Sequence, residues 1–155
     1  MTDPVTDPVK DPVADLAALS ALSALSGDER TTLAAASAER LLPHFEHFHE
    51  RTGAGSPEVL RSALAAVRTR LADGTEVTLR TMLDSFEQIQ VAADHIGEGT
   101  GPTLDEAARI AHLAWYAAAA VTNACHASVH GRVHETRLCL EYEDYAARLA
   151  GDVTG

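Results

Sequence analysis

The stretch Thr103–His130, TLDEAARIAHLAWYAAAAVTNACHASVH, decides the fold of this chain. It opens with Thr103 and, three residues later, Glu106, which is the spacing of a capping box at a helix N-terminus. Apolar and small residues then continue to the end of the stretch. Alanine favours the helical backbone and, being small, lets neighbouring helix axes approach closely. Because small residues lie on several sides of this helix, we expect it at the centre of a helical bundle.

The segment Ser56–Gly74 has the clearest start and stop signals in the chain. Ser56 suits the N-cap position, Pro57 suits the first helical turn, and Gly74 ends the pattern. Between them, apolar residues recur at four-three-four spacing, at Leu60, Leu64, Val67 and Leu71. That spacing predicts an amphipathic helix with one face in the core.

Four further helices are predicted on either side of these segments. A short helix begins at Asp11 or Pro12, and a second, capped by Ser26 or Asp28, runs to Gly53. Another begins at Thr75 or Thr78 and places apolar residues on one face, namely Leu79, Met82, Leu83, Phe86 and Ile89. The last helix follows Gly131 and ends at Gly151.

Pro43 lies inside the second predicted helix. Proline lacks the backbone N–H of the helical hydrogen bond, so it should kink this helix near residues 38–40 or split it. The sequence therefore predicts an all-α, single-domain bundle of about five to six helices, with the second helix kinked at Pro43.

A repeat precedes the bundle: residues 2–5, 6–9 and 10–13 read TDPV, TDPV and KDPV. A proline at every fourth position prevents both helix and sheet from propagating. We therefore expect a disordered tail at residues 1–11, the helical bundle domain at 12–150 and a flexible C-terminus at 151–155. The glycine-rich segment 97–102 is predicted to be a connecting loop.

The charge balance excludes two classes of partner. The chain has 12 basic and 23 acidic residues, a net charge of −11 with histidine neutral. A field of that sign repels the phosphates of nucleic acid and the headgroups of anionic lipid. We therefore expect no nucleic-acid partner and no membrane partner.

The cysteine pattern and the hydropathy favour a cytoplasmic location. Cys125 and Cys139 lie within helical patterns and do not share a Cys-x-x-Cys spacing, so we expect free thiols. The N-terminus does not resemble a signal peptide. The longest apolar stretch, 113–121, is far shorter than the roughly 20 residues that a membrane-spanning helix needs.

Eight histidines in a chain of 155 residues call for a test of metal binding, because imidazole is a common ligand for zinc. His126, His130 and His134 are four residues apart, which places neighbours on one helical face. The outer two would be about 12 Å apart, so at most one adjacent pair can chelate a single ion. A zinc site would need another ligand, for which His112 and Cys139 are the candidates.

The segment Glu46–His49 contains a Glu-x-x-His unit, the motif that di-iron bundles use. Such centres need two of these units and two further glutamates, and this sequence has no second unit. His47 and His49 therefore remain isolated candidate ligands. Phe45 and Phe48, three residues apart, are predicted to be core residues.

The sequence contains no complete catalytic motif. No Gly-x-Ser-x-Gly elbow is present, and Cys125 and His126 are adjacent positions that point about 100° apart on a helix. The glycines of 97–101 lack the Lys-Ser/Thr pair of a phosphate-binding loop. The acidic run 141–144 is predicted to be a solvated face. These observations favour a function without catalysis.

Several of these segments together resemble the YjaG-like family of uncharacterised bacterial proteins (domain of unknown function 416). The family pattern E-R-x-x-P-x-[YF]-x-x-F is similar to residues 39–48, and its T-G-x-G turn is similar to residues 52–55. A leucine-rich helix at 60–71, the segment 83–87 and the alanine-rich helix up to Gly131 follow in the family's order. The resemblance covers roughly residues 28–150. Arg68 stands where the family usually has a large aromatic residue.

The resemblance implies an all-helical bundle that associates with itself, and it implies no activity. From the residues we expect a cytoplasmic protein that acts by self-association, as a homo-oligomer, or by binding a protein partner through its alanine-lined helices, with no cofactor. The alternative is a histidine-based metal-binding protein or metalloenzyme that holds a transition metal. Its candidate ligands are His126, His130, His134, His112, His47 and His49. A pocket for a small molecule around Trp115 and Tyr116 is a third option.

Overall fold

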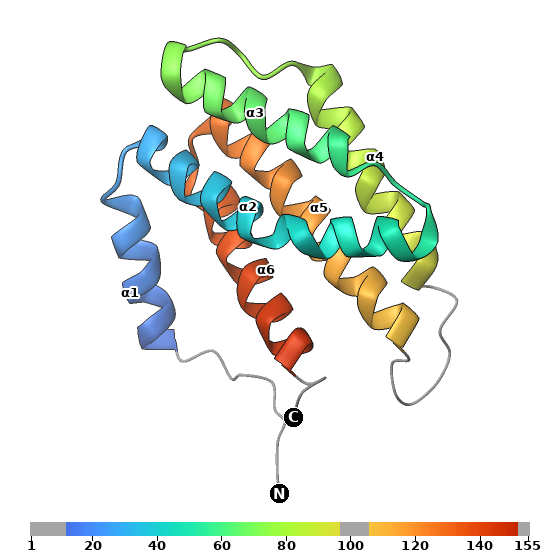
Figure 1. Ribbon diagram of the computed structural model, residues 1–155. Coiled ribbons are helices and arrows are strands. Elements are labelled where there is room, and N and C mark those ends of the chain that lie inside the picture. Colours follow the sequence, from blue (N-terminus) through green and yellow to red (C-terminus); the bar gives the residue numbers. More distant parts are fainter. Residues whose placement is uncertain (1–11, 97–105, 152–155) are drawn as a thin grey trace, which may run out of the picture.

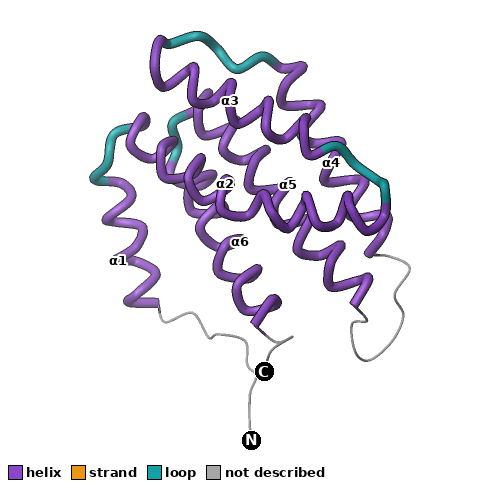
Figure 2. Tube along the Cα trace, in the orientation of Figure 1, coloured by secondary structure: helices purple, strands orange, loops and turns teal. Residues whose placement is uncertain are grey.

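Six α-helices make up the regular structure of residues 12–96 and 106–151, the parts of the chain that the computed structural model describes (Figure 1). No strand occurs in either part (Figure 2). The helices are α1 (Pro12–Ser23), α2 (Gly27–Thr52), α3 (Pro57–Asp73), α4 (Leu79–Ile96), α5 (Glu106–His130) and α6 (Val133–Gly151). The predicted all-α bundle is confirmed. The predicted tail, the loop 97–102, Thr103 and residues 152–155 lie outside the described residues.

The helix ends follow the capping residues of the sequence. Ser26 caps α2: its hydroxyl accepts a hydrogen bond from the backbone N–H of Glu29 at 3.1 Å, and the Glu29 carboxylate accepts one from the backbone N–H of Ser26 at 2.8 Å. Gly53 ends α2 with a left-handed backbone (φ 72°), a conformation that costs glycine little. In the same way Ser56 caps α3, where its hydroxyl accepts from the backbone N–H of Val59.

Pro43 does not split α2, which is continuous from Gly27 to Thr52. Figure 1 shows that the helix changes direction about halfway along, and Figure 2 shows the same bend. A bend of this kind is expected where proline removes a backbone hydrogen bond. It lets the second half of α2 reach across the bundle, where Phe45 and Phe48 are fully buried and their rings pack edge to face at 5.5 Å. Both are core residues, as predicted.

Helix α5 lies at the centre of the bundle, as its small residues predict. It packs against α2, α3, α4 and α6. Ala114, Ala117, Ala118 and Ala120 are all completely buried. These alanines therefore contact other helices of the same chain, and the surface they form is not free to bind a second protein.

Arg30, near the start of α2, connects distant parts of the bundle. Its guanidinium donates hydrogen bonds to the carbonyl of Gly131, between α5 and α6, and to the carbonyl of Leu22 in α1. Thr136 of α6 in turn donates to the carbonyl of Arg30 at 3.0 Å. One side chain thus holds α1 and the α5–α6 turn against α2.

Candidate functional site

An apolar groove with a volume of about 600 Å³ lies between α4 and α5. We call it the α4–α5 groove. Its lining residues are Leu79, Met82, Leu83, Phe86, Ile89, Thr122, Asn123, His126 and His130. None of these is an acid, although the chain carries a net charge of −11. The groove is therefore suited to contact with an apolar surface of another molecule.

Three residues on the outer side of α4 remain unusually exposed for their type. Leu79, Leu83 and Phe86 are 67%, 51% and 46% exposed, and they are spaced four and three residues apart. That spacing places them on one stripe of the helix. We call this stripe the α4 face. The same three residues line the α4–α5 groove, so the α4 face forms one wall of the groove.

The polar groups beside the groove are engaged with the fold. The buried hydroxyls of Ser85 and Thr122 are hydrogen-bonded at 2.7 Å, and Thr122 donates to the carbonyl of Ala118 at 3.0 Å. The Asn123 amide nitrogen donates to the carbonyl of Ala119 at 2.9 Å. The bond between Ser85 and Thr122 fixes α4 against α5, and the bonds of Thr122 and Asn123 to α5 carbonyls hold their side chains in place along the groove.

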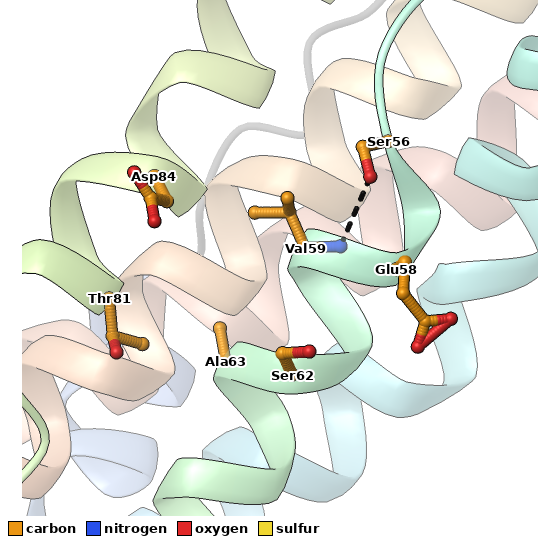
Figure 3. Close-up of a pocket in the computed structure, with 7 residues that line it drawn as sticks. All are labelled: Ser56, Glu58, Val59, Ser62, Ala63, Thr81 and Asp84. Carbon is orange, nitrogen blue, oxygen red and sulfur yellow. Dashed lines mark hydrogen bonds between the residues drawn. The ribbon is translucent and has the colours of Figure 1, made fainter.

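A second, more polar hollow lies between the start of α3 and α4, with a volume of about 330 Å³ (Figure 3). Val59 and Ala63 of α3 face Thr81 and Asp84 of α4 across it. The Asp84 carboxylate is 3.4 Å from the Arg80 guanidinium. The lining residues are Ser56, Glu58, Val59, Ser62, Ala63, Thr81 and Asp84, and they include neither histidine nor cysteine. Its polar groups are hydroxyls and carboxylates, and one of the hydroxyls, that of Ser56, accepts a hydrogen bond from the backbone N–H of Val59 as the cap of α3.

Of the histidines considered as metal ligands, His126 and His130 lie together. Their rings contact edge to face with centroids 6.2 Å apart, at the end of the α4–α5 groove near Leu79. His134 is exposed on α6, beyond the break at Gly131. In the described parts of the chain, no group of three histidine, cysteine, aspartate or glutamate side chains is arranged to hold a metal ion.

The remaining candidate histidines lie apart from one another, and two of them bond to nearby backbone carbonyls. The Nδ1 of His112 donates a hydrogen bond to the carbonyl of Ala108 at 3.1 Å, and the Nδ1 of His49 donates to the carbonyl of Ala54 at 3.0 Å. His47 is exposed. Next to it on α2, burial and the charge of His47 together lower the pKa of His44. The structure therefore does not bring these residues into one site.

The two cysteines are inert as nucleophiles. Cys125 and Cys139 are free thiols and fully buried. Burial raises the pKa of Cys125 to about 12, and burial is also the main cause of the raised pKa of Cys139. The reactive form of cysteine is the thiolate, which neither residue forms near neutral pH. Cys125 also lies in the core, whereas its neighbour His126 lines the groove.

The aromatic residues of α5 and α6 pack on one another. The Trp115 ring is edge to face with Tyr116 at 5.7 Å and with Tyr142 at 5.6 Å, and Tyr145 lies 6.0 Å from Tyr116. Burial raises the pKa of Tyr116 and of Tyr142. Trp115 and Tyr116, the residues proposed for a small-molecule pocket, therefore contribute to the packing of α5 against α6.

Reasoning from the sequence did not single out the α4–α5 groove. The available signal was the width of the apolar face of α4, which has five large apolar residues. In the structure, Met82 and Ile89 pack partly against the core, whereas Leu79, Leu83 and Phe86 stay exposed. An apolar face wider than the core can cover is a sign of an external contact.

Comparison with known proteins identifies a family. The family model described as "Protein of unknown function (DUF416)" matches residues 18–129, more than half of the chain. No curated protein and no solved structure matches it. Within the described residues, no helix is long and apolar enough to cross a membrane.

Proposed function

Because this chain belongs to the DUF416 family of proteins of unknown function, we propose its function from geometry: it works by association, and the α4 face with the α4–α5 groove binds a second copy of the chain. The observation that carries the proposal is the exposure of Leu79, Leu83 and Phe86 beside an apolar hollow. Adjacent exposed apolar residues of this size mark interaction surfaces in proteins.

We propose a second copy as the occupant, because it would bring the same apolar groove, with no acid in its lining, to the contact. In a two-fold dimer, the same patch of both copies forms the contact. Leu83 and Phe86 are exposed and also line the groove, so a two-fold rotation would place the same apolar side chains of both copies in one contact. The alanines of α5, which the sequence suggested for this role, are buried within the chain.

The distribution of charge also favours the α4–α5 groove as the contact surface. Two copies with a net charge of −11 each repel one another, so they associate best through a surface without acids. No acid lines the α4–α5 groove. On α4 itself, Asp84 forms an ion pair with Arg80 at 3.4 Å, so its charge is partly offset. The groove lining thus adds no acidic repulsion to the contact.

The size of the surface sets the expected affinity. Helix α4 has 18 residues and is therefore about 27 Å long, and α4 and α5 together are about 20 Å wide. The contact covers on the order of 500 Å² per copy, less than the roughly 800 Å² of a standard stable interface. We therefore expect a dissociation constant on the order of micromolar.

The test is a matched pair of substitutions, Leu79→Glu and Leu16→Glu. Leu79 and Leu16 are exposed to 67% and 65%, but Leu16 lies on α1, away from the groove. Burying one leucine side chain contributes about 1.5 kcal/mol to the free energy of association, and a two-fold dimer buries Leu79 of both copies. Leu79→Glu should therefore weaken association about 100-fold. Leu16→Glu should have no effect.

Sedimentation velocity or light scattering after size exclusion, over a range of protein concentrations, measures both effects. A monomer at about 100 µM would overturn self-association and leave the face to a partner of different sequence. Equal weakening by both substitutions would show that α4 is not the interface. The circular dichroism spectrum of each variant checks that it is folded.

A further inference from the structure

The two histidines at the end of the α4–α5 groove have a feature that apolar association does not use. His126 and His130 are four residues apart on α5 and their rings are in contact, with centroids 6.2 Å apart and planes at 77°. Two imidazoles that bind one zinc ion through nitrogens at about 2.1 Å have centroids about 5 Å apart. Both could bind the same ion if side-chain rotations brought the rings about 1 Å closer and turned one nitrogen of each toward a common point.

One chain supplies only half of a zinc site at this position. Zinc in proteins takes four ligands, or three and a water molecule. In the described parts of the chain, no third histidine, cysteine, aspartate or glutamate joins this pair. A site built on His126 and His130 is therefore incomplete unless another molecule contributes ligands.

We propose that His126 and His130 of two copies together bind one divalent transition-metal ion of the zinc class, on the two-fold axis of the dimer. The inference rests on the proposed self-association through the α4–α5 groove, which the two histidines line. Four neutral imidazoles at the axis form a tetrahedral ligand set, the geometry that zinc adopts. Metal binding then controls the strength of the dimer.

Electrostatics favours an ion at this position. Each copy carries a net charge of −11, and a divalent cation at the contact reduces the repulsion between the copies. The groove contributes no carboxylate, so the ion would be held by imidazole nitrogen alone. Such a ligand set selects zinc, copper or nickel over calcium and magnesium, which require oxygen ligands.

The experiment uses the full chain, purified without an affinity tag, in EDTA or in zinc chloride. An ion that binds only the dimer strengthens association in proportion to its occupancy: at a free zinc concentration about ten times the dissociation constant of the site, the dimer is about tenfold tighter. His126→Asn and His130→Asn should abolish this gain. The control is His134→Asn, which removes an exposed histidine four residues further on, in α6, and should retain it.

Stoichiometry provides a second readout. Titration with cobalt, followed by its visible absorption, should end at one ion for two chains. One ion for each chain would overturn the inference. It would also be overturned if zinc tightened the dimer of His126→Asn as much as that of the unchanged protein.

A dimer in EDTA whose dissociation constant zinc leaves unchanged would also overturn the inference, while the proposed self-association would stand. A monomer under both conditions would overturn both proposals, and a dimer seen only with zinc would support the metal site and contradict metal-free association.

Discussion

Gly55 and Gly53 have nearly the same positive φ angle but very different surroundings, which makes them a matched pair for measuring packing in the turn between α2 and α3. Their φ angles are 74° and 72°. A Cβ atom on Gly53 would have no neighbour within 4 Å. A Cβ atom on Gly55 would lie 2.7 Å from Cζ and 2.9 Å from Cε1 of Phe45. Carbon atoms prefer separations of about 3.5–4.0 Å.

We expect Gly53→Ala to cost about 1 kcal/mol, because a left-handed backbone with a Cβ atom is strained by about that amount. Gly55→Ala should cost about 3 kcal/mol, since overpacking adds about 2 kcal/mol. The Phe45 ring cannot easily move away, because it is fully buried and packs against Phe48. The difference of about 2 kcal/mol corresponds to a Tm lower by about 4–8 °C in a protein of this size.

Urea unfolding of both variants, followed by circular dichroism, measures the two costs. A double-mutant cycle with Phe45→Leu then identifies the cause, because removing part of the ring should bring the cost of Gly55→Ala close to that of Gly53→Ala. Costs for the two glycine variants that agree within about 0.5 kcal/mol would refute the packing argument, since that is the limit of additivity for independent sites.

Two further predictions concern titration and reactivity. The pKa of His44 is lowered in the folded state, so the unfolded chain binds the proton more tightly and stability should fall as the pH drops below about 6.5. His44→Gln should flatten the pH dependence of the urea midpoint there, and His134→Gln should not; an unchanged slope in His44→Gln would count against burial as the cause. Because Cys125 and Cys139 are buried thiols with raised pKa values, a disulfide reagent at pH 8 should modify neither in the folded protein and both in urea, and rapid reaction of either thiol without denaturant would contradict their assigned burial.

Local signals in the sequence predicted most of the fold. Ser26, Ser56 and Gly74 mark helix ends because capping depends on a few neighbouring residues, and those ends were confirmed. The small residues of α5 likewise predicted its central position. Whether Pro43 would kink or split α2 depended on tertiary packing, and the packed helix is continuous.

The groove could not be predicted in the same way, because it depends on which helices meet. The sequence placed five apolar residues on one face of α4, but the exposure of Leu83 follows from where α5 and α3 leave α4 uncovered. The contact of His126 with His130 was implied by their spacing. Their position beside the α4 face was not, since it requires the end of α5 to pack near the start of α4.

The hydrogen bonds of Arg30 have a consequence for protein synthesis. Its guanidinium binds the carbonyl of Gly131, 101 residues further along the chain. While the ribosome is still producing the intervening residues, α1 and α2 lack this partner, and α2 also lacks the surface of α5. Nascent chains of larger proteins that expose apolar surface are prone to aggregate. The N-terminal half can therefore complete its packing only after α5 and the turn at Gly131 have left the exit tunnel.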